Sequence, residues 1–358
     1  MQTILFVISS LGYGGAARQL TLLAAGLPRQ SFRVRVVVLG VESPWAVSLR
    51  EKGIEVDTLG WRRPFDVLPF AALRRLMRSE QPDVVHVWGA TALRTVVLTG
   101  NRRVNRLLVS AVLAPAARAG RLDRWLLRRA KGVIAFGATD AERYRRLGVP
   151  DARITVVSPA ATIPATVAES VELPGVAPTN RVLLGLGPIE QHKGFREGVW
   201  AFDILRHFYH DLHLVLAGAG PDRPRVEQFA RQIGISGHVH FLGPYADPTP
   251  LLHRAEVVWV PSLRGGGVGA TLEAMAAARP VVASRCSDLA EVVVDGETGF
   301  LVEPDNKAAL ARQTRLLLDD AALRQSMGET GRRRVAEHFS VDRLVETCGR
   351  RYAEEKKN

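Results

Sequence analysis

One pattern runs through almost the whole chain: short runs of apolar, mostly β-branched residues alternate with amphipathic stretches of helical period. In the first half the apolar runs lie at 3–9, 33–39, 54–59, 83–88, 107–113, 132–137 and 154–158. In the second half they lie at 181–187, 212–218, 238–243, 256–261 and 280–284. Helical patterns fill most of the intervals, for example 15–27, 67–79 and 121–131. Strands that alternate with helices predict right-handed crossover units and a parallel sheet covered on both faces.

The pattern pauses once, which predicts two domains. Residues 159–178 are rich in Pro and Ala and carry no helical stripe, and we assign 161–178 to a linker. An N-terminal α/β domain then spans 1–160 and a C-terminal one spans 179–339, each long enough for its own core. Ligands of open α/β sheets bind at the carboxyl ends of the strands. Two such sheets facing each other would hold a ligand in the cleft between them.

Composition excludes several other classes of protein. Hydrophobic residues make up 47% and charged residues 23%, which is unlike collagen, a coiled coil or a disordered chain. No Lys or Arg precedes Arg18, so the basic start of a signal peptide is missing, and no run of about 20 apolar residues could span a membrane. The two cysteines, Cys286 and Cys348, have no metal-ligand spacing. These features predict a cytoplasmic protein without a disulfide framework or a zinc site.

The net charge of +12 is unevenly distributed. Residues 1–160 contain 25 Lys or Arg and 11 Asp or Glu, whereas residues 161–358 contain 23 and 25. A basic half points to an anionic partner such as nucleic acid, an acidic substrate or an anionic membrane. Because 42 of the 48 basic residues are Arg, a bias in genome composition is the alternative explanation.

The most basic segment, 120–132, places apolar side chains among arginines. Its candidate membrane or acceptor face consists of Arg121, Arg124, Trp125, Arg128 and Arg129. A basic amphipathic helix with a tryptophan can lie on an anionic membrane. It can equally be an ordinary surface helix whose apolar side packs on the sheet. Nucleic-acid binding has the charge but no recognition module to support it.

A glycine turn follows the first strand. Gly12, Gly14 and Ala17 fit the G-x-G-x-x-A pattern, in which glycines let the backbone approach a phosphate at a helix N-terminus. A nicotinamide-binding enzyme should also have an acidic residue ending the second strand, and here Glu42 comes slightly late. An oxidoreductase and a plain tight turn therefore both remain open.

The second half repeats such turns at its strand ends. Lys193 and Gly194 lie in the turn that leaves strand 181–187, and a glycine-rich turn at 216–222 leaves the next strand. A lysine at a strand end before a helix can act as a point charge for a phosphate. The alternative is a solvated surface lysine.

The clearest signal lies at 261–284. Gly265, Gly266 and Gly267 would bring backbone amides to an anion at the start of the next helix. That helix carries Glu273 within the apolar segment LEAMAAA, where an unpartnered carboxylate would be costly to bury. Such a carboxylate could accept both hydroxyls of a ribose. A partly solvated glutamate at the helix edge is the alternative.

In their order and spacing, these motifs resemble the retaining GT-B glycosyltransferases of family 4. The similarity includes LGYGGAARQL, HKG, GAGP, FLGPY, PS followed by LEAMAAARPVVAS, DGETGFLV and the closing FSVDRL. It implies two Rossmann-like, doubly wound parallel-sheet domains that face a central cleft. It also implies that the final helix, 340–358, crosses back to the N-terminal domain.

The resemblance also assigns a binding site for a nucleoside-diphosphate sugar, UDP- or GDP-linked, with no cofactor required. Lys193 would contact the diphosphate, and Gly14 and Gly15 would approach it from the opposite domain. Glu273 would bind the ribose. The amides that would cap the diphosphate belong to Gly267, Val268, Gly269, Ala270 and Thr271, and the residues near the base would be Gly243 and Tyr245.

Four positions depart from the family pattern. Pro188 stands where an Arg usually joins the Lys on the diphosphate, and Gly265 stands where a Glu contacts the transferred sugar. Arg264 or Arg196 could supply the missing cation. Strand 107–113 lacks its usual final His, and residues 158–160 replace an Asn-Gly. No Asp-x-Asp sequence is present, so we expect no required metal.

These observations lead to one main hypothesis and two alternatives. The main hypothesis is a glycosyltransferase that moves a sugar from a nucleoside-diphosphate sugar to a hydroxyl of a saccharide or glycolipid, with retention of configuration. We expect it in the cytoplasm, peripheral to the inner face of the membrane, and without a nucleic-acid partner. The alternatives are a catalytically degenerate relative that only binds the nucleotide and a nicotinamide-dependent oxidoreductase.

Overall fold

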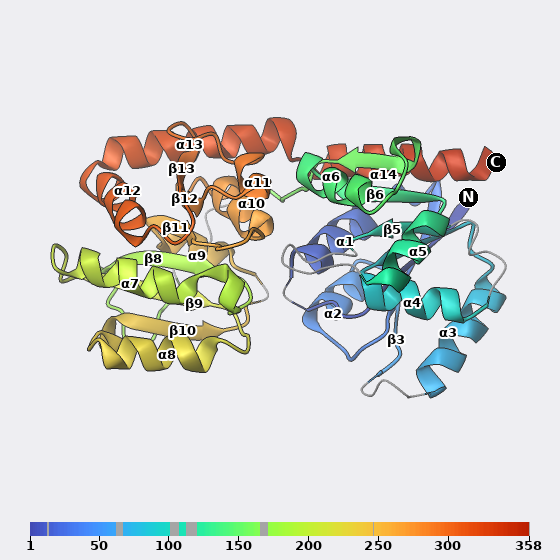
Figure 1. Ribbon diagram of the computed structural model, residues 1–358, viewed down its shortest axis with the longest axis horizontal. Helices are drawn as coiled ribbons and strands as arrows, with labels where there is room; N and C mark the ends of the chain where they lie inside the picture. The colour runs from blue at the N-terminus through green and yellow to red at the C-terminus, as the bar shows by residue number, and fades with distance from the viewer. Residues whose placement is uncertain are drawn as a thin grey trace. The chain divides into compact units, whose positions relative to one another are not determined.

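The computed structural model describes residues 1–12, 14–61, 67–100, 107–111, 120–164, 171–245 and 247–357. The chain divides into two compact units (Figure 1). Met1–Ala160 and Val341–Asn358 form the first unit, and Ala161–Ser340 form the second.

The first unit is built on a parallel sheet of seven strands in the order β3-β2-β1-β4-β5-β6-β7. The strands are β1 (Gln2–Ile8), β2 (Phe32–Val38), β3 (Glu55–Thr58), β4 (Val84–Trp88), β5 (Leu107–Ser110), β6 (Gly132–Phe136) and β7 (Ile154–Val157). The helices are α1 (Gly15–Gly26), α2 (Pro44–Glu51), α3 (Val67–Glu80), α4 (Ala90–Leu98), α5 (Arg121–Arg129), α6 (Ala138–Arg146), the short η2 (Asp151–Arg153) and α14 (Val341–Lys357).

The second unit repeats this plan with six parallel strands in the order β10-β9-β8-β11-β12-β13. The strands are β8 (Arg181–Leu186), β9 (Leu212–Ala217), β10 (Val239–Gly243), β11 (Val257–Val260), β12 (Val281–Ser284) and β13 (Gly299–Val302). The helical segments are η3 (Gln191–Lys193), α7 (Phe195–Arg206), α8 (Arg223–Gln232), η4 (Ser236–His238), α9 (Thr249–Arg254), α10 (Val268–Ala276), α11 (Ser287–Ala290), α12 (Lys307–Asp319) and α13 (Ala321–His338).

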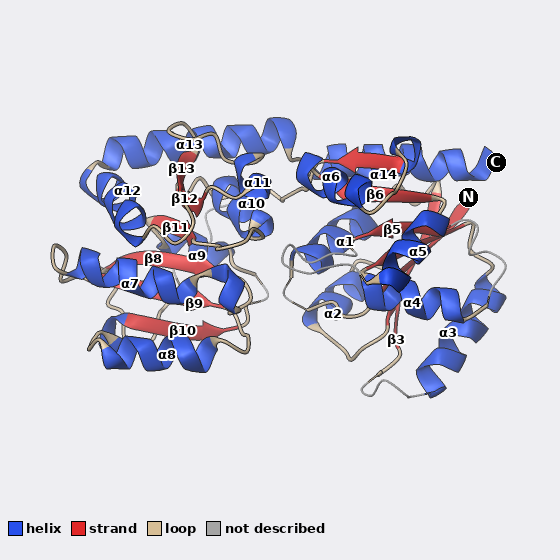
Figure 2. Cartoon of the chain, viewed as in Figure 1, coloured by secondary structure: helices blue, strands red, loops and turns tan. Residues whose placement is uncertain are grey.

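Each sheet separates two hydrophobic cores, because alternate residues of a strand point to opposite faces. In β1, Ile4 and Phe6 belong to one core and Leu5 to the other. In β8, Leu183 likewise lies on the opposite face from Val182. Helices cover both faces of each sheet (Figure 2). Burial on both faces explains why these strands are continuous apolar runs in the sequence.

The predicted fold class is confirmed: both units are Rossmann-like α/β domains with parallel sheets. Every predicted strand overlaps an observed one, but none of the predictions corresponds to β13, which has four residues. The described part of the segment assigned to a linker belongs to the second unit, where Ala161, Leu173 and Val176 are buried in its core. Residues 165–170 of that segment lie outside the described part of the chain.

Helix α14 completes the first unit through a buried chain of hydrogen bonds. The Tyr352 hydroxyl bonds to Nδ1 of His86 at 2.7 Å, and Nε2 of His86 bonds to Oγ of Ser110 at 2.8 Å. Since Ser110 donates its own hydrogen to the carbonyl oxygen of Ile134, it accepts from Nε2, and Tyr352 donates to Nδ1. Burial lowers the pKa of His86 to about 3, so this histidine is neutral.

Candidate functional site

The strand order of each sheet locates its candidate ligand site. In the second unit the order reverses between β8 and β11. Open α/β sheets bind ligands at the carboxyl ends of the strands at such a switch point. The loop after β8 contains Lys193, and the loop after β11 contains the glycine run Gly265–Gly267. The topology therefore brings together the two loops that the sequence singled out independently.

The loop after β8 is packed directly against the loop after β11. Gly194, which ends η3, has a left-handed backbone with φ of 68°. A Cβ on Gly194 would overlap the carbonyl oxygen of Pro261, so only glycine fits there. The Leu263 amide donates a hydrogen bond to the carbonyl of His192 at 2.8 Å. These contacts fix the backbone that carries Lys193.

The loops after β9 and β10 continue the same edge. A Cβ on Gly218 would overlap the Gly187 carbonyl oxygen, and the Ile189 amide donates to the Ala219 carbonyl at 3.0 Å. Gly243, at the end of β10, forms a β-bridge with Gly218. The predicted base-proximal Tyr245 is partly buried against the core of this unit. The predicted turns thus line one continuous edge.

The glycine run has a backbone that only glycine adopts easily. Gly265, Gly266 and Gly267 have φ of 85°, 79° and 106°. Both backbone groups of Gly266 are held: its amide donates to Oδ2 of Asp288 at 2.6 Å, and its carbonyl accepts from Oγ of Ser262 at 2.8 Å. The run is therefore fixed by side chains before α10 begins.

Helix α10 presents an uncapped N-terminus at this edge. Its N-cap is Gly267, and no side chain caps it. The first amides of a helix have no intrahelical partner, so those of Val268, Gly269 and Ala270 are available to an anion. The Thr271 amide, which was also predicted to cap the diphosphate, is not available, because it donates to the Gly267 carbonyl at 2.9 Å.

Glu273 lies farther along the same helix. It is partly buried and shares a helix face with Gly269 and Ala270, which lie four and three residues earlier. Its neighbours Leu272 and Ala274 are fully buried in the core. The helix thus orients the Glu273 carboxylate toward the side that also carries the first-turn residues.

Lys193 is partly buried, and carboxylates act on its charge. Burial lowers the pKa of Lys193, whereas the charges of Asp288 and Glu190 act to raise it. Glu190 also contacts Nδ1 of His192 at 3.2 Å. A diphosphate at this position would, like these carboxylates, favour the protonated and charged form of Lys193.

The structure also shows what surrounds the positions that depart from the family. Arg196 is engaged elsewhere, since its guanidinium lies 4.9 Å from the ring centre of Phe229 and 3.8 Å from Glu197. Arg264 is exposed on the glycine-run loop. A Cβ on Gly265 would lie 2.9 Å from Oδ1 of Asp288. Asp288 is the residue that the sequence reasoning missed, and its only local signal is an acidic residue just after strand 280–284.

The glycines at the start of α1 lie at the corresponding edge of the first unit. Gly14 is the N-cap of α1, and a Cβ on Gly14 or Gly15 would meet nothing within 4 Å. Glu42 contacts Arg50 at 3.0 Å and Thr58 at 3.3 Å. The acidic residue that could have bound a nicotinamide dinucleotide is therefore occupied by its own unit.

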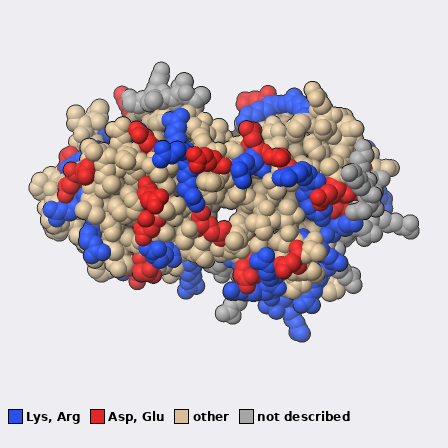
Figure 3. Space-filling view, turned by 90° about the horizontal axis from the view of Figure 1, so that it is seen from above, with Lys and Arg blue, Asp and Glu red and all other residues tan. Residues whose placement is uncertain are grey.

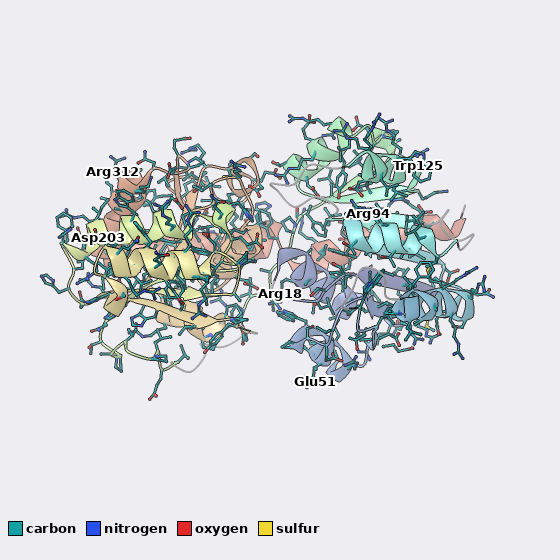
Figure 4. All side chains as sticks on the ribbon, turned by 60° about the horizontal axis from the view of Figure 1, so that its bottom comes forward. Arg18, Glu51, Arg94, Trp125, Asp203 and Arg312 are labelled. Carbon is teal, nitrogen blue, oxygen red and sulfur yellow. The ribbon has the colours of Figure 1, made fainter. Side chains whose placement is uncertain are left out.

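Helix α5 divides its apolar residues between the core and the surface. Leu126 and Leu127 are buried, whereas Leu122 is 53% and Trp125 46% exposed. Arg94 of α4, which is labelled in Figure 4, holds α5 through a bidentate contact to Asp123 at 2.6 and 2.7 Å. Of the predicted basic face, Arg121, Arg124 and Arg128 are exposed, and the Arg129 side chain lies outside the described residues.

The described residues also lack two features. Among them, none of the helices combines the length and the apolar character that crossing a membrane requires. No group of three or more His, Cys, Asp or Glu side chains in that part of the chain is arranged to hold a metal ion.

Comparison with known proteins defines the class that this fold and site represent. Residues 13–161 match the family described as Glycosyltransferase Family 4, and residues 170–334 match Glycosyl transferases group 1. The chain belongs to this family of GT-B glycosyltransferases, with one characteristic domain in each half.

Individual relatives agree with this assignment. The lipopolysaccharide core biosynthesis glycosyltransferase LpsE of Rhizobium meliloti is 25% identical over 84% of this chain and 90% of its own length. Glycogen synthase of Mycobacterium tuberculosis is 30% identical over 61% of this chain, which spans about half (53%) of that relative. The crystal structure of Anabaena HepE with UDP-glucose has a TM-score of 0.85, at 19% identity, over 99% of this chain and all (100%) of HepE.

Proposed function

We propose that this glycosyltransferase moves a sugar from a UDP- or GDP-linked donor to a hydroxyl of a saccharide or glycolipid, with retention of configuration. The observation that supports this most strongly is the carboxyl edge of the second sheet. There Lys193, the glycine run and the uncapped α10 lie on adjoining loops at the topological switch point. The UDP-glucose bound to HepE and the lipopolysaccharide role of LpsE fit the proposed donor and acceptor.

The chemistry would rest on stabilising the departing diphosphate. Breaking the sugar–phosphate bond places charge on the leaving phosphate oxygen, and preorganised donors stabilise that charge most effectively. The Lys193 ammonium and the first amides of α10 are such donors, and no metal is needed in this scheme. Glu273 would accept the two ribose hydroxyls, and Gly243 and Tyr245 would lie beside the base.

We further propose that the first unit associates with an anionic membrane surface through α5. Exposed Leu122 and Trp125 lie among Arg121, Arg124 and Arg128, which is the arrangement of an interfacial helix. Basic and acidic side chains are interspersed over the face shown in Figure 3.

A donor screen that reads the release of UDP or GDP, with lipid and saccharide acceptors present, tests the proposed reaction. Lys193→Ala should reduce turnover about 100- to 1000-fold, as expected for the loss of one preorganised donor. The matched control is Lys307→Ala, because Lys307 lies in the same unit and pairs with Asp305 at 2.6 Å. Turnover that is unaffected by Lys193→Ala would contradict the proposed site.

Binding and thermal-unfolding measurements alongside this screen separate the alternatives. A degenerate relative would bind UDP or GDP without any turnover. An oxidoreductase would be stabilised against thermal unfolding by NAD(H) or NADP(H) and not by UDP or GDP, which would overturn the proposed function.

A further inference from the structure

A carboxylate stands at the edge that the proposed function assigns to a diphosphate. Asp288, in α11, holds the amide of Gly266 at 2.6 Å through Oδ2. Its two oxygens lie 2.9 and 3.2 Å from the point where a Cβ on Gly265 would be. Of the charges that favour protonated Lys193, that of Asp288 is the largest. A negative group thus adjoins both the glycine run and the site cation.

A diphosphate alone does not explain this carboxylate, because like charges repel across such a short space. A sugar diphosphate, however, has two chemically different parts. The cation of Lys193 and the α10 amides suit the anionic part. A carboxylate is a strong acceptor of hydrogen bonds from hydroxyls, so Asp288 suits the sugar.

The hydrogen bonds that Asp288 already makes leave room for this role. An ionised carboxylate has about four acceptor positions. In the described residues, Oδ2 accepts from Gly266 and Oδ1 from the adjacent amide of Leu289 at 3.1 Å. The residue is partly exposed. Because Gly265 has no side chain, it does not fill the space beside the carboxylate.

We infer that Asp288 determines donor specificity: it positions the glycine run through Gly266 and accepts a hydrogen bond from a hydroxyl of the transferred sugar. This inference rests on the proposed donor site. It assigns the diphosphate and the sugar to different side chains, Lys193 and Asp288, so substitutions can separate the two.

Two substitutions at Asp288 test the inference. Asp288→Asn keeps the shape of the side chain and one acceptor for the Gly266 amide but removes the negative charge. Asp288→Ala removes the acceptor as well as the charge. The matched control is Asp320→Asn, since Asp320 also accepts a backbone amide, that of Leu323 at 2.9 Å, but at the start of α13. The probes are UDP and UDP-glucose, or GDP and GDP-mannose if the wild type binds guanine instead.

Asp288→Asn should leave the affinity for the nucleoside diphosphate within about twofold and lower that for the nucleotide sugar about tenfold or more. Its Gly266 amide should remain protected from hydrogen exchange. In Asp288→Ala the Gly266 amide should lose that protection, and the affinity for both ligands should fall. Asp320→Asn should change neither the protection nor the affinities.

If the role of Asp288 were merely structural, Asp288→Asn would lower the affinity for both ligands equally or for neither of them. Either result would overturn the inference. Failure of the proposed function looks different. In that case wild-type protein would bind neither probe, or Lys193→Ala would leave nucleoside-diphosphate affinity unchanged, and both proposals would fall together.

Discussion

The two units share one strand order but use glycine differently at the carboxyl edge of the sheet. In the second unit, Gly194 and Gly218 lie so close to the backbone of neighbouring loops that no side chain fits. In the first unit, Gly14 and Gly15 have open space where a Cβ would be. Close backbone packing therefore requires glycine at these two loop positions of the second unit, whereas packing by the described residues does not require glycine at Gly14 or Gly15.

The units also differ in where they place polar groups. The first unit buries a polar chain through His86 that joins α14 to the sheet. The second unit concentrates Lys193, Asp288 and Glu273 at or beside its edge. The buried chain through His86 thus serves assembly, whereas Lys193, Asp288 and Glu273 lie where a ligand could contact them.

Acid should destabilise the first unit through His86. The unfolded chain protonates its histidines near pH 6.5, whereas folded His86 resists protonation until about pH 3, so stability falls as the pH is lowered between these values. The full loss is about 5 kcal/mol. His86→Gln should flatten this dependence in urea unfolding at several pH values, and His338→Gln, at an exposed site, is the control. Equal acid sensitivity in wild type and His86→Gln would contradict this explanation.

Reversing the basic face should have the next largest effect. Replacing Arg121, Arg124, Arg128 and Arg129 by Glu should remove at least about 4 kcal/mol of binding to anionic vesicles, at about 1 kcal/mol for each cation. The same charge change at Arg312, Arg315, Arg332 and Arg333 of the second unit is the control. Wild-type binding should also weaken as salt shortens the Debye length below about 8–10 Å. Equal binding to neutral and anionic vesicles would refute the membrane proposal.

A glycine-to-alanine substitution in the closely packed loop after β8 tests whether packing requires glycine there. Gly194→Ala combines left-handed strain with an overlap on Pro261 and should cost about 3 kcal/mol or more. Gly234→Ala has a similar φ of 75° but open space, and should cost only about 1–2 kcal/mol. Gly15→Ala should leave stability nearly unchanged. Urea unfolding of the three variants measures the difference, and equal costs at Gly194 and Gly234 would remove the argument for close packing.

Removing the proposed ribose acceptor should have the smallest of these effects. Glu273→Ala should weaken UDP or GDP binding about tenfold to a hundredfold, the equivalent of 1.5–3 kcal/mol for hydrogen bonds to a charged group. It should leave binding of inorganic pyrophosphate unchanged, whereas Lys193→Ala should weaken both. The control is Glu329→Ala, at an exposed position of α13. Calorimetry that shows unchanged nucleotide affinity in Glu273→Ala would require the ribose assignment to be withdrawn.

The sequence alone was sufficient for the two α/β domains and for most strands, because strands buried on both faces are apolar along their whole length. It also located Lys193, the glycine run and Glu273, since each lies at a strand end or in the helix that follows. It did not reveal β13, a strand of four residues. Nor did it show that Leu173 and Val176 belong to a core, because the surrounding Pro-rich composition is typical of a linker.

Other features were decided only by the tertiary structure. Asp288 and Gly265 are separated along the chain, and they meet because β11 and β12 are neighbours in the sheet. The helical period could not tell which apolar residues of α5 face the sheet, and packing buried Leu126 while leaving Trp125 exposed. His86 and Tyr352 are 266 residues apart in the chain and meet only when α14 docks. Local patterns specify the elements, but contacts between loops depend on the order in which the strands assemble.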